Sequence, residues 1–457
     1  MKKMARREFI KNAGLATGVT LAAPAFIQSM IQDSPNERIN VAVAGFHGRG
    51  ESHYRAFSRM RNVRVSILCD PDERLFKDAV ADVEKTAGYR PATEFDFRRL
   101  LDDKNIDAIS IASPDYWHAL MTIWACQAGK DVYVEKPVSF TVDEGRKMVE
   151  AARRYKRMVQ AGQNRRSEPR TRAAVRLLHD GKLGSVYRTK ASLVKPRAGI
   201  GRVPDSPAPE GVHWDLFLGP SPNRPFNLNR FHYGWHFFWE TSTGDIGNSM
   251  VHEIDLLRWG MNKNVHPVRI HSTGGYFIWD SEQETPNVQS ATFEYADGTL
   301  LEAEVTNLYA PARQGGILFY TTRGYLTSEE GWKTFVGTIT PRENDIASSG
   351  ISERVTNASF PKASYVPGPA VEAPTDGAPS HFENFVSCVR SRKVEELFCD
   401  IEQGHLSAAL CHLANISCRT GRKIVFDPKM ERIVGDDEAN RLLSRKYRKP
   451  YILPDRA

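Results

Sequence analysis

Short apolar strands alternate with helical segments between about residues 38 and 160, and this alternation constrains the fold more than any other feature. The predicted strands are Asn40–Ala44, Val63–Leu68, Ala108–Ala112 and Val132–Val134. Strands separated by helices at this spacing predict an α/β Rossmann domain, which is a doubly wound parallel sheet. Because crossovers between parallel strands are right-handed, the loops after the strands meet at one edge of the sheet, where a ligand would bind.

The pattern changes after about residue 160. Two predicted strands, Ser290–Tyr295 and Leu300–Val305, flank Asp297-Gly298, which is a hairpin signal. Residues 196–230 are rich in proline and glycine and are predicted to form a long surface loop. These features predict a second domain of the α+β class, built on a mixed or antiparallel sheet.

The patterns divide the 457 residues into four parts, because a chain of this length exceeds one typical domain. They are an amino-terminal segment over residues 1–30, the Rossmann domain over 38–160, the α+β domain over 161–425, and a C-terminal tail over 426–457.

Composition excludes several classes of protein. Hydrophobic residues make up 41% and charged residues 26%, as in an ordinary globular protein. The net charge is +7, but +4 of it lies in residues 1–30, and no basic stripe with interleaved aromatics occurs, so nucleic acid is not an expected partner. The six cysteines are scattered without metal-ligand spacing, so no metal is expected and small buried side chains are the better interpretation.

The amino terminus has the pattern of an export signal. Arg6 and Arg7 precede Phe9, an apolar run follows from about residue 13 to 23, and Ala23-Pro-Ala25 resembles a cleavage site. The paired arginines resemble a twin-arginine signal, which implies the twin-arginine export machinery as a partner and a periplasmic or otherwise exported location. The alternative is the start of a basic amphipathic helix.

A glycine-rich loop follows the first predicted strand. The residues Gly45, His47, Gly48, Arg49 and Gly50 are predicted to hold a pyrophosphate against a helix N-terminus, although His47 occupies the second glycine position of the dinucleotide motif. Asp70 ends the second strand, 20 residues after Gly50, where a carboxylate accepts hydrogen bonds from the adenosine ribose. This favours NAD over NADP, while the nearby Arg74 could weaken the preference. The alternatives are a plain strand-to-helix turn and a helix cap at Asp70.

Two further loops lie at the same predicted edge. The loop after the third strand contains Ser113, Pro114 and His118, which are expected near the ribose and nicotinamide end of the cofactor. The alternative is that this loop serves merely to cap the next helix. Glu135 and Lys136 follow the fourth strand. A lysine at the carboxyl end of a buried strand, downstream of a glycine-rich loop, indicates a nicotinamide enzyme.

A second polar set occurs in the later domain. Asn248, His252 and Asp255 are spaced i, i+4 and i+7, which places them on one face of a helix. A secondary alcohol that loses a hydride needs a group to accept its hydroxyl proton, and lysine or histidine suits that role. Lys136, with its pKa lowered by burial or by the nicotinamide charge, is predicted to accept the proton, with His252 holding or relaying it. Asn248 cannot accept a proton.

Substrate contacts are predicted from aromatic and basic residues. Aromatic side chains cluster over residues 231–239, including Trp239, and would suit the C–H faces of a sugar, although core packing is an equal alternative. Arg165 and Lys195 could reach substrate hydroxyls or could be solvated surface.

Taken together, residues 45–50, Asp70, 113–118, 135–137 and 244–255 resemble the Gfo/Idh/MocA oxidoreductases, over residues 38–420. The resemblance implies a large, mostly antiparallel open sheet in the second domain, NAD or NADP as cofactor, sugars or cyclitols as substrates, and a homo-oligomer formed through that sheet. The family often has aspartate where this chain has Asn248, which removes a carboxylate from the expected proton relay.

The predicted function is an exported NAD(H)-dependent oxidoreductase that acts on a CH–OH group of a sugar, glycoside or polyol. Free NAD is scarce outside the cytoplasm, so an alternative is an enzyme that reduces and reoxidises its bound cofactor in each turnover. Such an enzyme would be a redox-assisted glycoside hydrolase or lyase. A further alternative is a non-catalytic sugar-binding protein.

Overall fold

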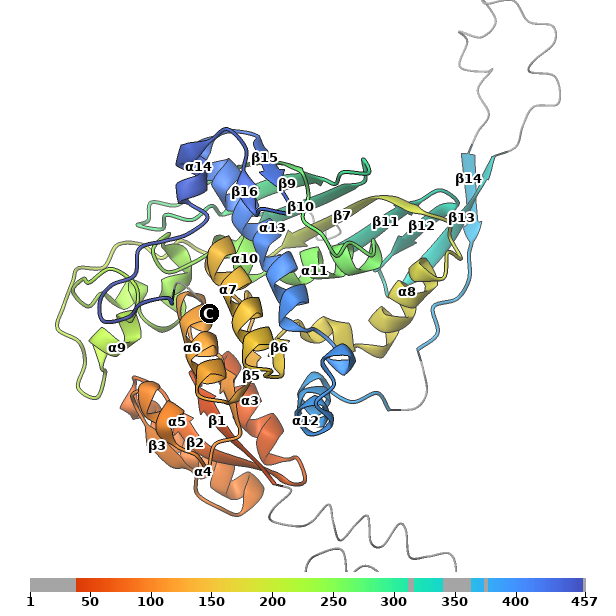
Figure 1. The fold of residues 1–457 in the computed structure, drawn as a ribbon. Coiled ribbons are helices and arrows are strands. Elements are labelled where there is room, and N and C mark those ends of the chain that lie inside the picture. Colours follow the sequence, from red (N-terminus) through yellow and green to blue (C-terminus); the bar gives the residue numbers. More distant parts are fainter. Residues whose placement is uncertain (1–37, 311–315, 340–362, 374–376, 455–457) are drawn as a thin grey trace, which may run out of the picture.

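The computed structural model describes residues 38–310, 316–339, 363–373 and 377–454, so the predicted signal peptide lies outside the described residues. Two sheets form the framework (Figure 1), one parallel and one mostly antiparallel. The predicted fold class is confirmed for both parts. No helix within the described ranges is long and apolar enough to cross a membrane.

The first sheet has six parallel strands in the order β3-β2-β1-β4-β5-β6. The strands are β1 (Ile39–Ala44), β2 (Val63–Cys69), β3 (Ala92–Glu94), β4 (Ala108–Ile111), β5 (Asp131–Val134) and β6 (Val159–Ala161). The helices are α3 (Arg49–Ser58), α4 (Phe76–Ala87), α5 (Arg98–Asp102), α6 (Asp115–Gln127) and α7 (Val142–Arg154). Strands β4 and β5 are fully buried, as expected for a sheet covered on both faces.

The strand order reverses between β1 and β4, which are neighbours in the sheet. The chain leaves β1 toward β2 on one side and leaves β4 toward β5 on the other. The loops at the carboxyl ends of β1 and β4 therefore diverge and leave a crevice, where open α/β sheets bind ligands.

The second sheet has ten strands in the order β14-β13-β12-β11-β7-β10-β9-β8-β15-β16. The strands are β7 (Val186–Val194), β8 (Arg269–Gly275), β9 (Val288–Glu294), β10 (Leu300–Thr306), β11 (Gly316–Thr321), β12 (Gly324–Thr327), β13 (Lys333–Ile339), β14 (Ala363–Pro367), β15 (Ile424–Asp427) and β16 (Arg432–Ile433). Among the described strands of this sheet, only the β7–β10 pair is parallel. The hairpin predicted at Asp297-Gly298 joins β9 to β10, and Gly298 has the positive φ of 83° that this turn requires.

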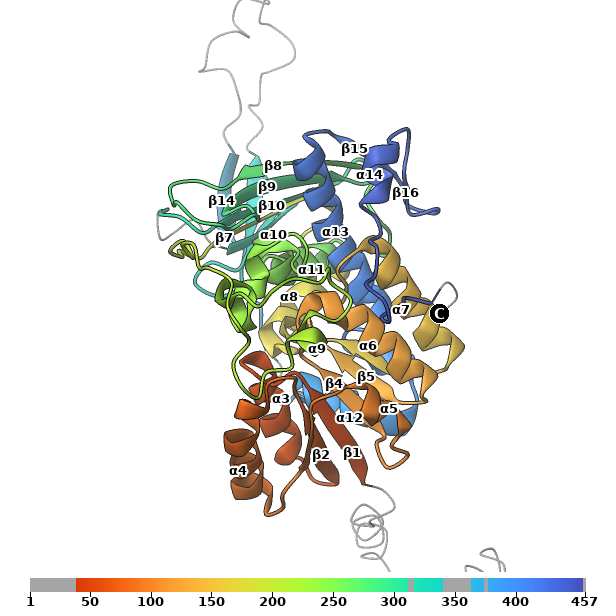
Figure 2. The same cartoon turned by 90° about the vertical axis from the view of Figure 1, so that its left-hand side faces the viewer.

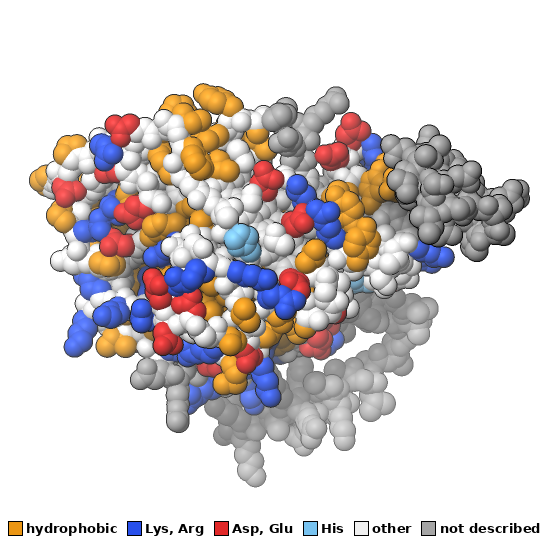
Figure 3. Space-filling view, turned by 90° about the horizontal axis from the view of Figure 1, so that it is seen from above, with side chains coloured by type: hydrophobic (Ala, Val, Ile, Leu, Met, Phe, Trp, Pro, Cys, Tyr) orange, Lys and Arg blue, Asp and Glu red, His pale blue; other side chains and the backbone are white. Residues whose placement is uncertain are grey.

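The two faces of the second sheet differ in character. Inward residues such as Phe293, Leu301 and Phe319 pack in one core with α11 and α13. On the outer face, Arg188 pairs with Glu302 across β7 and β10 at 2.8 Å. Figure 3 looks onto the molecule from this side and shows charged side chains of both signs between hydrophobic groups.

The remaining helices are α8 (Pro169–His179), α9 (Trp214–Leu218), α10 (Gly244–Asn248), α11 (Val251–Gly260), α12 (His381–Ser391), α13 (Ile401–Thr420) and α14 (Asp437–Arg441). The long helix α13 contributes Ala408 to the core of the first domain and Leu410 to the core of the second, so it joins the two (Figure 2).

Residues 196–240, which we call the strap, connect β7 to α10. The prediction of a long surface loop over 196–230 is wrong in part, because this segment contains α9 and a small core of Phe217, Phe226 and Phe231. The carbonyl oxygen of Phe217 accepts a 2.6 Å hydrogen bond from the Tyr116 hydroxyl on α6. In Figures 1 and 2, α9 accordingly lies beside α6.

The chain end returns to the first domain. Arg445 donates a 2.7 Å hydrogen bond to the buried Glu144 on α7, and Tyr451 is 2% exposed. All six cysteines are free and five of them are buried.

Candidate active site

A cavity of about 620 Å³ opens at the carboxyl ends of β1, β2, β4 and β5 and is closed on its other side by the strap and by α10–α11. Most of the residues predicted from the sequence line it: Gly45, His47, Gly48, Arg49, Asp70, Ser113, Pro114, His118, Glu135, Lys136, Arg165, Lys195, Asn248 and His252. Gly50, Trp239 and Asp255 do not line this cavity.

The glycine loop has the shape that a pyrophosphate needs. A Cβ at Gly45 would lie 2.5 Å from the Ser113 nitrogen, and one at Gly50 would lie 1.9 Å from the Gly45 oxygen. Gly50 is therefore required for the packing of the loop rather than for the wall of the cavity. Gly48 caps α3 with φ 78°, and a Cβ there would meet open space. The loop thus presents backbone and a helix N-terminus to the cavity, which fits a dinucleotide.

Asp70 closes one side of this loop. Its carboxylate accepts hydrogen bonds of 3.0 Å from the backbone N–H groups of Phe46 and Asp72. Burial raises the pKa of Asp70 to about 6, so the group is ionised at neutral pH. Arg74, the residue that could favour a 2′-phosphate, instead binds Asp72 through two hydrogen bonds of 2.7 Å.

Glu135 and His118 hold the loops in place. Glu135 accepts hydrogen bonds from Arg49 at 2.9 Å and from His53 at 3.1 Å; burial opposes its charge, but these partners hold its pKa well below the usual range. His118 contacts the carbonyl oxygens of Pro137 at 2.7 Å and Ser113 at 2.8 Å. Both ring nitrogens are engaged, so His118 ties the loop after β4 to the loop after β5.

Lys136 reaches across the cavity to the second domain. Its Nζ donates a 2.9 Å hydrogen bond to the backbone oxygen of Asn248 and lies 3.4 Å from the Asn248 side-chain oxygen. Burial lowers the pKa of Lys136, only partly offset by the charge of Glu135. A lysine with a lowered pKa in a cavity can exchange a proton with a bound hydroxyl.

His252 lies beside Lys136 in a neutral state. Burial, followed by the charge of Lys136, lowers the pKa of His252 to about 3. Its Nδ1 is buried and has no hydrogen-bond partner among the described residues. The imidazole can therefore hold or relay a hydroxyl proton.

The prediction that Asp255 shares a helix face with Asn248 and His252 is wrong. The helix is interrupted, since α10 ends at Asn248 and α11 begins at Val251. The Asp255 carboxylate accepts two 2.7 Å hydrogen bonds from Arg166 and one from Ser407. Asp255 therefore forms a buried ion pair with Arg166 in the protein interior, away from the cavity.

Of the other residues predicted to contact substrate, some line the cavity and one does not. Trp239 lies away from the cavity, with the Arg419 guanidinium 4.9 Å from its ring centre. Arg165 lines the cavity and donates a 2.7 Å hydrogen bond to Glu253. Lys195 lines it from the end of β7.

Glu253 and His236 are among the titratable residues of the cavity that were missed. Glu253 has one carboxylate oxygen buried without a partner among the described residues, and burial raises its pKa. It directly follows His252, so helical periodicity alone would point it elsewhere. His236, whose pKa burial lowers to about 3, stacks on Trp235 with ring centres 3.6 Å apart. The aromatic composition of residues 231–239 was the available signal.

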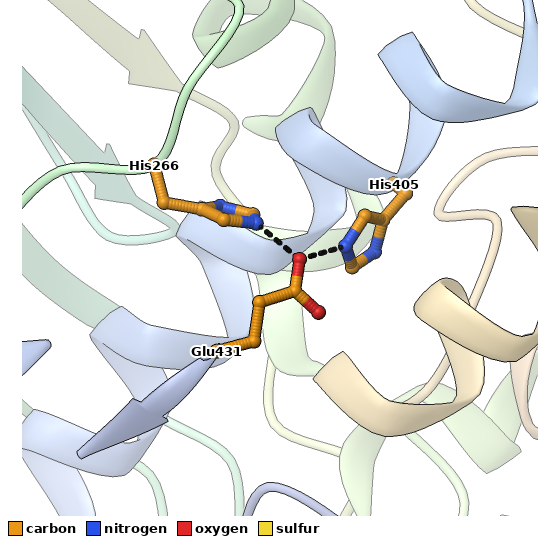
Figure 4. Close-up of side chains that lie close together, drawn as sticks. All are labelled: His266, His405 and Glu431. Atoms are coloured by element: carbon orange, nitrogen blue, oxygen red, sulfur yellow. Dashed lines mark hydrogen bonds and ion pairs between the residues drawn. The ribbon is translucent and has the colours of Figure 1, made fainter. Parts of the chain in front are cut away.

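A separate group of titratable residues lies outside this cavity (Figure 4). His266 and His405 both contact the same oxygen of Glu431, at 2.8 and 2.9 Å. Arg146 on α7 binds that oxygen too, at 2.6 Å. The guanidinium already balances the carboxylate charge, so the group acts as a tie between α7 and the second domain.

The parallel sheet with its glycine loop, the carboxylate after β2 and the lysine after β5 define a dinucleotide-dependent oxidoreductase. The chain belongs to the GFO/IDH/MocA oxidoreductase family. The family's NAD-binding Rossmann fold matches residues 39–163, the GFO/IDH/MocA C-terminal domain matches residues 171–327, and the C-terminal alpha/beta domain of the oxidoreductase family matches residues 369–453. NAD is therefore the cofactor.

Among curated proteins, the chain is 27% identical over 214 residues to glycosyl hydrolase family 109 protein 1 of Shewanella sp. (strain ANA-3), covering 42% of this chain and 47% of the relative. It is 25% identical, with the same coverage, to an alpha-N-acetylgalactosaminidase of Shewanella oneidensis. The chain thus spans less than half the length of these relatives.

Solved structures share the fold. The WlbA dehydrogenase of Bordetella pertussis, in complex with NADH and UDP-GlcNAcA, has 19% identity and a TM-score of 0.59, covering 85% of this chain and 99% of that one. The aldose-aldose oxidoreductase of Caulobacter crescentus has 14% identity and a TM-score of 0.60, covering 85% and 100%.

Proposed function

We propose that this chain catalyses NAD-dependent hydride transfer at a secondary hydroxyl of a sugar, glycoside or polyol, and that it is exported. The observation that carries the proposal is Lys136. Its ammonium lies in the cavity with a lowered pKa, and within the described part of the chain it hydrogen-bonds only to the oxygens of Asn248. NAD supplies the hydride acceptor or donor when it is bound.

The residues around Lys136 divide the remaining tasks. Lys136 exchanges the hydroxyl proton, and the free Nδ1 of the neutral His252 accepts or relays it. The Asn248 carbonyl orients the ammonium. Because Asn248 offers an amide in place of a carboxylate, the proton leaves through His252.

A sugar-like substrate is supported by the wall opposite the nucleotide loop. Trp235 and Tyr233 line the cavity with aromatic groups, which suit apolar C–H groups, while Arg165 and Lys195 offer hydrogen-bond donors. The solved relatives named above include proteins whose names refer to aldoses and to a UDP-sugar.

A second candidate is glycoside cleavage without net redox change, and Glu253 favours it. Cleavage needs a group that protonates the leaving oxygen, in addition to the pair that handles the hydroxyl. Glu253 has a raised pKa and an unpartnered oxygen in the same cavity, as a general acid requires. Curated relatives named as glycosyl hydrolases agree with this chemistry.

One experiment separates these candidates. The full-length protein is incubated with NAD and a panel of aldoses, uronates, polyols and nitrophenyl glycosides, while NADH absorbance and nitrophenol release are followed together. Substrate-dependent NADH formation supports oxidation. Nitrophenol release without NADH accumulation supports glycoside cleavage. If neither occurs and the sugars themselves are not converted, while sugar binding is detectable by calorimetry, the chain is a non-catalytic sugar-binding protein.

A further inference from the structure

The strap makes backbone contact with the nucleotide edge of the first domain. Val212 forms an isolated antiparallel bridge with Asp72. The Glu73 N–H donates to the Gly211 oxygen and the His213 N–H donates to the Pro71 oxygen, both at 2.8 Å. The loop that directly follows Asp70 is therefore hydrogen-bonded to a segment that lies about 140 residues later in the chain.

Side chains strengthen this contact. His232 of the strap contacts the Asp72 carboxylate at 2.7 Å, and its ring lies 3.9 Å from the ring of His47 in the glycine loop. His213 stacks on Phe95, with ring centres 4.1 Å apart and planes within 11°. A hydrogen bond and ring contacts therefore hold the strap at two points along the cavity.

The conformation of His232 agrees with a specific role. Its φ is 46°, in the left-handed region that is uncommon for a residue with a side chain and is costly unless the surroundings hold it. The carboxylate that binds it is itself fixed by Arg74 and is 1% exposed. The hydrogen bond to Asp72 thus helps to hold His232 in this conformation.

The same contacts form a wall of the cavity. His47, Asp70 and Phe95 line it from the first domain, and His232 and Phe217 line it from the strap. A dinucleotide held by the glycine loop and Asp70 would thus be covered by the strap. We infer that residues 211–213 and 232 of the strap form a latch that retains NAD, so that the cofactor stays bound from one turnover to the next. This inference rests on the proposed use of NAD and adds a positioning role for His232.

The test measures the release of NADH. Full-length protein is loaded with NADH, and release is followed by nicotinamide fluorescence after a chase with excess NAD. His232→Ala, which removes both the hydrogen bond to Asp72 and the ring contact with His47, should release NADH about tenfold faster or more. His47→Gly removes the same ring contact from the other side, so it should also speed release. His179→Ala is the control, because His179 is exposed on α8 and, among the residues described, bonds only the Trp259 oxygen.

Each outcome decides the inference. Faster release by His232→Ala and His47→Gly, with the control unchanged, supports the latch. A His232→Ala protein that melts at a lower temperature but releases NADH at the wild-type rate would show that the strap only packs, and would overturn it. If His232→Ala does not fold, unchanged release by His47→Gly overturns it equally. A wild-type protein that takes up no NADH would contradict the nucleotide site and the proposed function together.

Discussion

The ammonium of Lys136 donates a 2.9 Å hydrogen bond to the backbone oxygen of Asn248, a residue 112 positions later in the chain. This bond joins the end of β5 to the end of α10, and so joins the first domain to the second at the centre of the cavity. A carbonyl oxygen orients the amine without adding the negative charge that would raise its pKa. The relationship explains how the lysine can be fixed in position and still exchange a proton.

Replacing Lys136 by alanine should reduce turnover by about a hundredfold to ten-thousandfold, because a positioned acid–base group contributes that range. NADH binding, measured by fluorescence titration, should persist, since the glycine loop and Asp70 remain. Lys190→Ala on the outer face of the second sheet, where the ammonium lies 4.0 Å from Glu304, is the matched control. Loss of NADH binding by the Lys136 variant would reassign the lysine to the cofactor site.

Replacing Asp70 by asparagine should narrow the preference for NADH over NADPH by about tenfold, because the charged acceptor for the ribose is lost. The pKa of Asp70 is about 6, so in the wild type the preference should weaken as the pH falls below that value and the carboxylate becomes protonated. Fluorescence titrations with both nucleotides at two pH values measure this. Equal preference in variant and wild type would assign Asp70 to loop packing through Phe46 alone.

The first domain could be predicted closely from the sequence because its signals are local. The apolar runs of β1, β2, β4 and β5, the glycine loop and Asp70 each depend on neighbouring residues or on fixed spacing. The residues that line the cavity from this domain could also be predicted, since parallel strands bring their carboxyl ends to one edge of the sheet.

The strap and Asp255 could not be predicted in the same way, because distant residues determine them. The strap core of Phe217, Phe226 and Phe231 has no helical or strand periodicity. Asp255 has the spacing of a site residue, yet Arg166 and Ser407 capture its carboxylate from remote parts of the chain. Only the tertiary structure shows these partners.

Replacing Glu253 by glutamine should slow aglycone release from glycosides and leave NADH binding unchanged. Burial raises the pKa of Glu253, and the charge of Arg165 offsets part of this increase. The protonated acid is therefore present at low pH and is lost as the pH rises through the raised pKa. The variant should therefore lose the decline of kcat/KM on the alkaline side. Glu168→Gln is the matched control, since Glu168 is also near Arg165, at 3.9 Å, but is more than half exposed. An unchanged pH profile would exclude Glu253 as the acid.

Replacing Arg6 and Arg7 by lysine should keep the protein in the cytoplasm, because twin-arginine recognition reads the arginine pair and not its charge alone. Cell fractionation with an antibody against the protein measures this in the native host. Lys2→Arg and Lys3→Arg form the control pair, since they change lysines outside the motif. Normal export of the Arg6/Arg7 variant would refute the proposed signal.

Replacing Glu431 by glutamine should reduce the free energy of unfolding at neutral pH by about 2–4 kcal/mol, because Arg146 loses a partly buried partner. Although burial opposes its charge, contacts with His266, His405 and Arg146 lower the pKa of Glu431 below its ordinary value of 4.5. A lowered carboxyl pKa contributes stability above pH 4.5, and this contribution is lost as the pH falls further toward the folded-state value. The pKa of His405 is also lowered, chiefly by burial, so the protein should begin to lose stability below pH 6.5, before Glu431 is protonated. Urea unfolding across this pH range should show both steps in the wild type, and only the histidine step in the Glu431 variant.

Glu402→Gln is the control variant, because it removes the other carboxylate near Arg146, at 3.2 Å. It should have a smaller effect on the free energy of unfolding, since the Glu402 side chain is 35% exposed. Equal losses from the two variants would mean that the tie between α7 and the second domain depends on the charge of Arg146 and not on the histidine contacts.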